Sequence, residues 1–148
     1  MTIRDIIQRI SRNKEALGIT LYPPATQLDI DVVENALNLP LPSELKEFYL
    51  FCNGFESEED LFRMVPLDEM REMSSRLTDN QIVIAEYLVY CDYWEMSVNK
   101  NESYEISEGS YHTILTDSFA LFLDRFLSGG VFEHGGLYEW KDTIIKRS

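Results

Sequence analysis

The sequence has 148 residues, and its 26 acidic and 13 basic side chains give a formal net charge of −13. This surplus of carboxylates argues against nucleic acid or an anionic membrane as the direct ligand, because both need clustered Lys and Arg. The surplus is compatible with a partner that has a basic face. It is equally compatible with a charge whose only role is to keep the protein soluble. With 45% hydrophobic and 12% aromatic residues, the chain has the material for one packed domain over residues 1–148.

The sequence indicates a cytoplasmic protein. Charged residues interrupt the first eighteen positions, so they do not resemble a signal peptide, and no window approaches the length of a membrane span. Cys52 lies inside an apolar helical pattern and Cys91 at the end of an apolar strand pattern, which predicts two small core residues in a reducing compartment.

Apolar residues recur at helical spacing three times in the first third of the chain. The pattern predicts a helix over 3–16 and a second that begins near Asp29, or at Thr26 if these two residues form a capping box. A third helix is expected to have Ser43 as its N-cap and to end at Asn53-Gly54, whereas 19–27 is expected to be an extended connector. The predicted buried faces are Ile3, Ile6, Ile7 and Ile10; Ile30, Val33 and Leu37; and Leu45, Phe48, Tyr49 and Cys52.

Strand patterns dominate the middle of the chain and helical patterns its end. Trp94, Met96 and Val98 alternate with polar residues, which is typical of a half-buried antiparallel strand. Other strands are predicted at 61–65, 81–85, 87–91 (as a continuation or a separate strand), 104–106 and 111–115, and helices at 69–77, from 116–118 onward and at 137–147. Helices, then strands, then helices is the order of an α+β fold.

The sequence contains little that indicates catalysis. It has no phosphate-binding glycine loop, zinc signature or nucleophile elbow, and the acidic run at 56–60 lacks the ligand spacing of a calcium loop. His112 or His134 could act as a general base, but a lone histidine is more often structural or at the surface. We therefore expect no enzyme activity, no cofactor and no bound metal.

Two stretches are candidates for contacting a protein partner. One is the acidic run at 56–60, which we interpret as a solvated loop, and the other surrounds Trp94, whose neighbours are expected to face outward if Trp94 is buried. Tyr138 and Trp140 form a further candidate patch. The predicted partner-binding residues are Glu56, Glu58, Glu59, Asp60, Asp92, Tyr93 and Glu95.

The helix pair at 30–54 carries a family resemblance. Its landmarks are Val33-Glu34, Leu37, Leu41-Pro42, Leu45, Phe48-Tyr49 and Asn53-Gly54. This pattern resembles the SMI1/KNR4 family of the SUKH superfamily, and later strand and helix features follow in the expected order, so that the resemblance covers 30–127. Leu37-Asn38 departs from the Leu-Gly that family members usually carry, and the tail from Val131 has no counterpart.

The resemblance implies N-terminal helices packed on a mostly antiparallel sheet of about six strands, closed by a C-terminal helix. It also implies a function, because bacterial members of the superfamily are largely immunity proteins that neutralise toxins, often nucleases. We therefore expect a non-enzymatic domain that binds a basic toxin through an acidic surface. The alternatives are a regulatory scaffold in cell-wall glucan synthesis, as in fungal relatives, and a small histidine-dependent enzyme.

Overall fold

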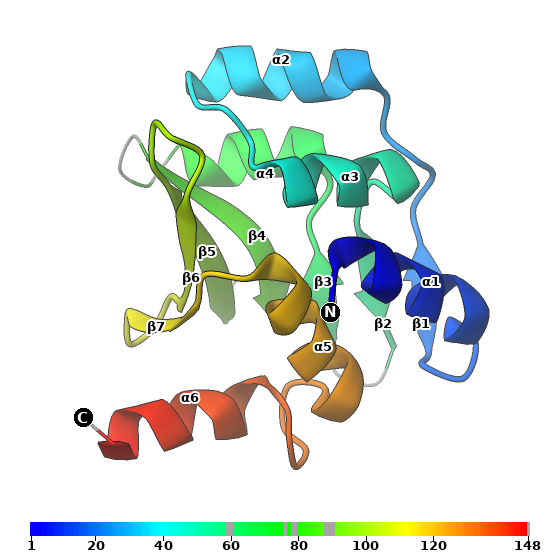
Figure 1. Cartoon of the computed structure of the whole chain (residues 1–148), viewed down its shortest axis with the longest axis vertical. Helices are drawn as coiled ribbons and strands as arrows, with labels where there is room; N and C mark the ends of the chain where they lie inside the picture. Colours follow the sequence, from blue (N-terminus) through cyan, green and yellow to red (C-terminus); the bar gives the residue numbers. More distant parts are fainter. Residues whose placement is uncertain (59–60, 76, 78–79, 88–90, 148) are drawn as a thin grey trace.

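The structure, a computed structural model, describes residues 1–58, 61–75, 77, 80–87 and 91–147. Within these ranges the chain forms six helices and a seven-stranded antiparallel sheet, so the expected α+β fold is confirmed (Figure 1). None of these helices has the length and apolar character needed to cross a membrane. In chain order the elements are α1 (Ile3–Asn13), β1 (Ile19–Leu21), α2 (Gln27–Leu37), α3 (Ser43–Phe51), β2 (Phe55–Ser57), β3 (Phe62–Met64), α4 (Leu67–Ser74), β4 (Gln81–Tyr87), β5 (Asp92–Val98), β6 (Tyr104–Glu108), β7 (Thr113–Thr116), α5 (Phe119–Gly129) and α6 (Leu137–Arg147).

The sheet is a meander in which each strand pairs with the next along the chain. Two of its strands differ from the sequence prediction. Residues 19–21 form strand β1 rather than a connector, and the first half of the acidic run belongs to β2 rather than to a loop. The sheet therefore has seven strands where the resemblance implied about six.

The helix starts follow local capping chemistry. Thr26 and Asp29 form a capping box, so α2 begins at Gln27 and the earlier of the two expected starts is correct. Ser43 is the first residue of α3 rather than its N-cap, because the preceding Pro42 already occupies that extended position. In the same way α4 begins directly after Pro66, which suits proline because the first helical N–H groups lack intrahelical acceptors.

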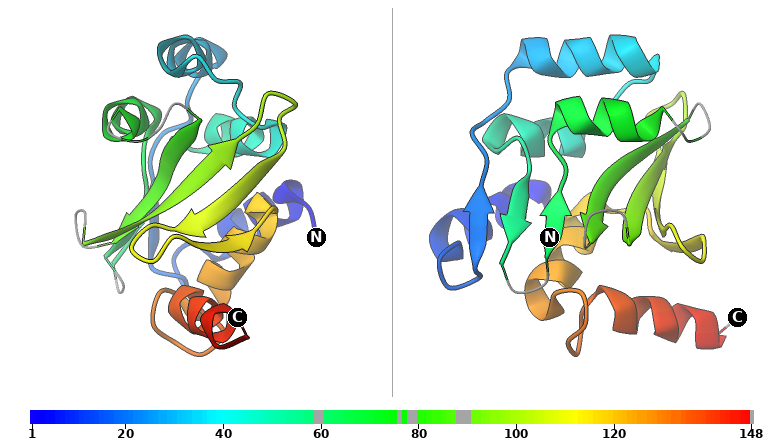
Figure 2. Two further views of the ribbon diagram at one scale, coloured as in Figure 1. Left: turned by 90° about the vertical axis from the view of Figure 1, so that its left-hand side faces the viewer. Right: turned by 180° about the vertical axis from the view of Figure 1, so that it is seen from behind.

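The two faces of the sheet are covered unequally. Helices α1, α3, α5 and α6 lie on one face, α4 lies at one end of the other face, and α2 lies beyond α3 and α4 (Figures 1 and 2). Seen from behind, β1, β2 and the lower part of β3 have no helix in front of them (Figure 2). We call this side of the sheet the open face.

Aromatic side chains fill the space between the sheet and the covering helices. Phe126 of α5 stacks on Phe62 of β3 with ring centroids 4.0 Å apart. Phe48 of α3 meets Phe55 of β2 edge-on. Trp94 is fully buried, as its strand pattern predicted. Burial is also confirmed for the other residues predicted for the helix faces except Ile7 and Leu37, which are partly buried: Ile3, Ile6, Ile10, Ile30, Val33, Leu45, Phe48, Tyr49 and Cys52.

The two cysteines differ. Cys52 is buried beneath α3, but Cys91 is exposed, and both thiols are free. The prediction that Cys91 is a core residue is therefore wrong. It lies in the turn that precedes β5, one residue before the strand pattern begins.

Candidate partner-binding face

The polar residues of the 30–54 motif are hydrogen-bonded within the scaffold. Glu34 Oε2 accepts the backbone N–H of Leu41 at 2.7 Å, which holds the proline turn against α2. The Tyr49 hydroxyl donates to the Val65 carbonyl at 2.6 Å, and Asn53 Oδ1 accepts the N–H of Leu67 at the start of α4 at 2.9 Å. These side chains join helices and strands, so the polar residues of the motif contribute to the fold.

Gly54 has a specific role in this scaffold. Its φ is +97°, and a Cβ built on it would lie 2.3 Å from the carbonyl oxygen of Met64. Any side chain at this position would therefore collide with the backbone of β3. Helix α3 itself ends at Phe51, with Cys52 as an extended C-cap, just before the Asn53-Gly54 that was expected to end it. Gly54 instead lets β2 enter the sheet beside β3.

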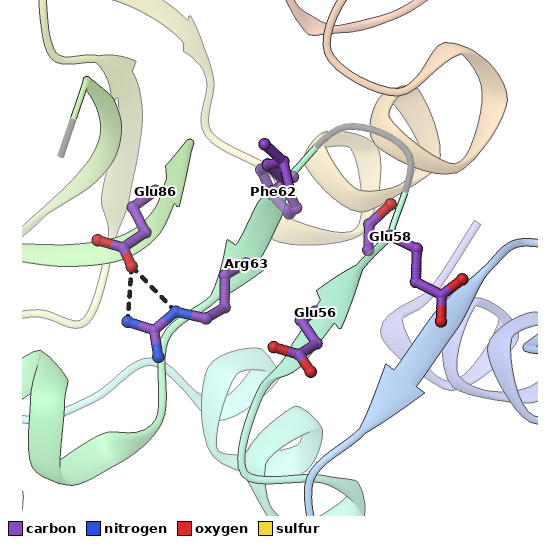
Figure 3. Close-up of a pocket in the computed structure, with 7 residues that line it drawn as sticks. Glu56, Glu58, Phe62, Arg63 and Glu86 are labelled. Atoms are coloured by element: carbon purple, nitrogen blue, oxygen red, sulfur yellow. Dashed lines mark hydrogen bonds and ion pairs between the residues drawn. The ribbon is translucent and has the colours of Figure 1, made fainter. Parts of the chain in front are cut away.

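A polar row crosses the open face. Strand register pairs Glu56 of β2 with Arg63 of β3, Arg63 with Glu86 of β4, and Glu86 with Tyr93 of β5. Because side chains alternate along a strand, these four residues lie on the side opposite Phe62 and Trp94. Figure 3 shows Glu56, Arg63 and Glu86 on three neighbouring strands.

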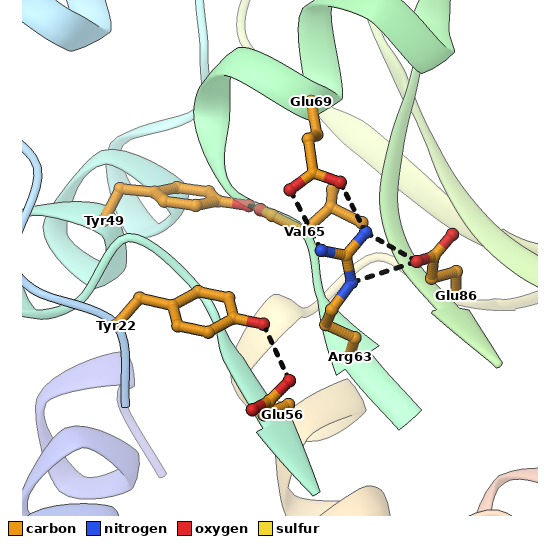
Figure 4. A network of polar contacts seen from close by, with 7 residues as sticks. All are labelled: Tyr22, Tyr49, Glu56, Arg63, Val65, Glu69 and Glu86. Carbon is orange, nitrogen blue, oxygen red and sulfur yellow. Dashed lines mark hydrogen bonds and ion pairs between the residues drawn. The ribbon is translucent and has the colours of Figure 1, made fainter. Parts of the chain in front are cut away.

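Arg63 is the cation of this row, and its N–H groups are engaged by carboxylates. Nε and Nη2 donate to Glu86 Oε1 at 2.9 and 2.6 Å. Nη1 and Nη2 donate to the two oxygens of Glu69 at 2.9 and 2.7 Å (Figure 4). Glu69 first and Glu86 next raise the pKa of the guanidinium above its already high value, so Arg63 stays charged and bound to these two acids.

A pocket of about 450 Å³ opens beside Arg63 between β2 and β3. We call it the β2–β3 pocket. Its exposed acidic residues are Glu56 in β2 and Glu58 in the turn that follows the strand. The Tyr22 hydroxyl donates to Glu56 Oε2 at 3.1 Å. The pocket is lined by Glu56, Ser57, Glu58, Leu61, Phe62, Arg63 and Glu86.

Glu56 and Glu58 are thus exposed, and their role in binding a partner stays a prediction. Glu56 is in strand β2, which gives its side chain a defined direction that a loop would not. Glu59 and Asp60, the other predicted residues of the acidic run, lie outside the described residues.

The prediction that the neighbours of Trp94 face outward is wrong for Asp92 and Glu95. Asp92 is 5% exposed because it is two residues from Trp94 and therefore on the same, covered side of β5. Glu95 is on the opposite side but is only 3% exposed. Tyr93 is partly buried, because its ring lies against Gly109, the residue that follows β6, where a Cβ would come within 2.5 Å of it.

Glu95 is a buried carboxylate with a weak partner. Burial raises the pKa of its carboxyl, and His112 partly offsets this rise. The Nδ1 atom of His112 lies 3.8 Å from Glu95 Oε1, and the histidine side chain is 75% exposed. Such a long, solvent-facing contact compensates a buried charge poorly.

A second acidic cluster lies on the covered side, where α6 meets the sheet. Asp92 accepts hydrogen bonds from the Tyr138 hydroxyl at 2.7 Å and from the Ser110 hydroxyl at 2.9 Å. Glu108 is fully buried and accepts the backbone N–H groups of Ser110 and Tyr111. Burial first, and the neighbouring Asp92 next, raise the pKa of Glu108.

Tyr138 and Trp140, the further candidate patch, belong to the packing of α6. Trp140 is 9% exposed, with the guanidinium carbon of Arg125 5.0 Å from its ring centroid. The Lys141 ammonium lies 4.3 Å from the ring centroid of Tyr138. These aromatic rings dock the last helix rather than present a surface.

Among the described residues, neither histidine belongs to a cluster of potential catalytic groups. The side chain of His134 is 96% exposed and contacts Glu139 at 2.9 Å, and His112 has only the contact to Glu95 described above. Within the described ranges no three His, Cys, Asp or Glu side chains come together as a metal site would require.

Arg63, Glu69, Glu86 and Glu108 are polar residues of these clusters that the sequence did not single out. Each is an ordinary charged residue in a strand or helix pattern. A search for charges at alternate strand positions would have marked Arg63 and Glu86, but their pairing depends on a register that the sequence alone does not give.

Comparison with known proteins supports the family resemblance. No curated protein matches the chain. The model of the SMI1 / KNR4 family (SUKH-1) matches residues 24–125, from just before α2 into α5, and leaves out α1, β1 and α6. Because this match covers more than half of the sequence, the chain belongs to the SMI1 / KNR4 family (SUKH-1).

Proposed function

We propose that this protein binds a basic protein toxin through the open face of its sheet and neutralises it by direct contact, without catalysis. The observation that carries the proposal is the charge balance around the β2–β3 pocket. Glu56, Glu58 and Glu86 line this pocket together with one cation, Arg63, whose N–H groups already bind Glu86 and the neighbouring Glu69. The face therefore lacks positive charge that a partner would supply.

The rest of the chain supports an electrostatic mode of recognition. Its formal net charge is −13, so the long-range field favours approach of a positively charged protein. Complementary charge accelerates encounter and discriminates against wrong partners, and it does so more strongly at low ionic strength. Nuclease toxins fit this chemistry because a protein that binds phosphates presents clustered Lys and Arg.

Family membership supports the toxin as the kind of partner. In the SUKH superfamily, bacterial immunity proteins block toxins by binding them, and the scaffold built by 30–54 is what this chain shares with that pattern. An immunity protein acts in the cytoplasm of the cell it protects, and that is the location we propose.

Coexpression with a toxin encoded beside this gene tests the proposal. We expect growth to be rescued, the two proteins to copurify, and the association rate to fall as salt rises. A double charge reversal, Glu56→Lys with Glu58→Lys, is expected to lower the association rate at least tenfold, by the size of electrostatic steering effects. The matched control reverses two exposed glutamates in turns outside the strands, Glu102→Lys with Glu133→Lys, and should keep rescue.

Two results would contradict the proposal. One is the absence of rescue and copurification with every toxin encoded nearby. The other is stable copurification with the cell's own envelope-synthesis proteins and no toxin, which would assign the protein to the regulatory-scaffold class instead.

A further inference from the structure

Two buried carboxyl groups meet where the last helix of the chain packs on the sheet. Asp92 at the start of β5 and Glu108 at the end of β6 are both buried. Strand register pairs Glu108 with Trp94, and Asp92 is two residues from Trp94, so both acids lie on the covered side. Ser110 joins them, because its hydroxyl donates to Asp92 Oδ1 and its backbone N–H to Glu108 Oε1, each at 2.9 Å. The two carboxyl groups are therefore neighbours at a buried position.

The contact between these two acids requires a proton. Ionised carboxylates only accept hydrogen bonds, so a bond between two carboxyl groups forms only if one of them is protonated. Two carboxylates that share a buried site also repel each other, which keeps a proton on one of them. After burial, the side-chain hydrogen bond with Asp92 is the next cause that raises the pKa of Glu108. The shared proton therefore lies on Glu108 and is donated to Asp92.

Lys141 of α6 balances the charge of the pair when this proton is present. The lysine is buried, and its ammonium lies 4.3 Å from the ring centroid of Tyr138 and 4.7 Å from that of Tyr111. Each of these tyrosines also binds one acid, since the Tyr138 hydroxyl donates to Asp92 and the Tyr111 backbone N–H to Glu108. With one proton the two acids carry a single negative charge opposite one ammonium. Without it, the interface under α6 holds an uncompensated negative charge.

The other ionisable groups near the pair leave it as the part of this interface that changes charge in mild acid. Glu95 and His112 contact each other on the opposite side of β5. The Arg125 guanidinium of α5 lies over Trp140, and Asp142 contacts Lys141 from a mostly exposed position. Phenol and ammonium groups ordinarily titrate near pH 10, far above the carboxyl range. Such groups around the pair, among the described residues, are Tyr87 of β4, Tyr93 of β5, Tyr111, Tyr138 and Lys141.

We propose that Asp92 and Glu108 form a pH-sensitive latch for α6, in which one proton shared by the two carboxyl groups holds the helix on the sheet and the loss of this proton loosens it. With the proton present, Asp92 accepts from both Glu108 and Tyr138, so β5, β6 and α6 are joined. Without it, two buried carboxylates repel each other, and local opening of α6 relieves the repulsion by admitting water. The latch is on the covered side of the sheet and does not depend on the proposed function.

Native-state hydrogen exchange of the full chain tests the latch. Protection factors, which are corrected for the intrinsic effect of pH on amide exchange, are measured for α6 between about pH 4 and pH 7. We expect them to be highest near the ordinary glutamate pKa of about 4.3, to fall by up to about tenfold per pH unit, and to level off above the folded-state pKa of the pair. Helix α2 lies at the opposite end of the molecule (Figure 1), and its protection should change less. An equal change in both helices would contradict the latch.

Variants and a direct titration identify the groups responsible. Glu108→Gln cannot titrate, and Asp92→Asn removes the neighbouring charge, so both should reduce the dependence of α6 protection on pH. Glu105→Gln, at an exposed position of the same strand, is the matched control and should keep the profile of the unaltered protein. The carbon-13 resonance of the Glu108 carboxyl group in the unaltered protein, which needs no variant, should titrate above about pH 4.3. Titration at or below that value, or an unchanged α6 profile in Glu108→Gln, would overturn the proposal.

Discussion

The hydroxyl of Tyr138 donates a hydrogen bond of 2.7 Å to Asp92 Oδ2, which ties the last helix of the chain to the start of β5. Asp92 is buried, and Tyr138 is partly buried, with its ring also in contact with Trp94. The bond therefore joins α6, which lies outside the family-matched span, to β5, which lies within it. The carboxylate raises the pKa of the Tyr138 hydroxyl, after burial, so Tyr138 remains a donor at neutral pH.

Replacing Tyr138 with Phe is expected to destabilise the protein by about 1–3 kcal/mol, the cost of leaving a buried charged acceptor without one of its donors. The ring stays, so its packing and the contact of Lys141 with its face are kept. Urea denaturation measures the loss, and hydrogen exchange should show it first in α6. Tyr111→Phe is the control because Tyr111 also faces Lys141 but is 68% exposed; an equal loss in both variants would show that the Asp92 bond is unimportant.

The burial of Glu95 makes stability depend on pH. Its pKa is raised in the folded state, whereas the unfolded chain titrates near the ordinary glutamate value of about 4.3. Over the interval between these values the folded protein holds a proton that the unfolded chain has released, so the free energy of unfolding falls as pH rises. The stabilisation that protonated Glu95 contributes is fully present below the ordinary glutamate pKa and is lost above the folded-state pKa of Glu95.

Urea denaturation of the unaltered protein and of Glu95→Gln at several pH values isolates this contribution. The variant cannot titrate, so the stability of the unaltered protein relative to it should decline from about pH 4 upward and then level off. Glu105→Gln changes the same group at an exposed site and should run parallel to the unaltered protein. A constant difference between the unaltered protein and Glu95→Gln would contradict a raised pKa.

The periodicity of apolar residues predicted the helices and strands that pack one face against the core. The 3.6-residue and two-residue repeats marked the buried sides of α3 and β5, because those repeats follow directly from backbone geometry. They missed β1 and β2, which are three residues long and flanked by prolines or acids. So short a strand has too few alternate positions to show a period.

The candidate site was less predictable than the fold because it depends on contacts between distant segments. Glu56 and Glu58 could be proposed from composition alone, but not their position beside Arg63, which depends on the register of β2 with β3. Asp92 was expected to be at the surface although its spacing from Trp94 already places it on the covered side. Glu95 followed the alternation and is still buried, which no pattern within its own strand could reveal.

Phe126 is the residue through which α5 holds the sheet. Its ring stacks on Phe62 at 4.0 Å and also contacts Phe55 at 5.9 Å, and it is 4% exposed. Phe126→Ala is expected to destabilise the protein by about 3–5 kcal/mol, since it removes a buried ring and leaves a cavity. Phe132→Ala removes a ring that is 54% exposed and should cost less than half as much in the same thermal or urea unfolding experiment. Similar losses of stability in the two variants would contradict the role assigned to Phe126.

The pairing of Arg63 with Glu86 is expected to dominate the energetics of the open face. Arg63→Met is predicted to cost about 3–5 kcal/mol, because it leaves the buried Glu86 carboxylate without its cation. Glu86→Leu alone removes that charge but leaves Arg63 with Glu69, which is more exposed, so its cost should be smaller. The double variant should be more stable than Arg63→Met, since a buried ion pair replaced by apolar groups of similar size is often neutral.

A double-mutant cycle in urea measures this coupling, and a coupling energy of about 2 kcal/mol or more is expected for a charge pair that is largely desolvated. Arg9 and Asp124 form the reference pair, with Nη1 and Oδ1 2.7 Å apart at a more accessible position. Solvent screening should hold its coupling to about 1 kcal/mol or less. If the two cycles gave equal values, the Arg63–Glu86 pair would be an ordinary surface contact, and the loss of stability in Arg63→Met would have to come from packing of the arginine stem instead.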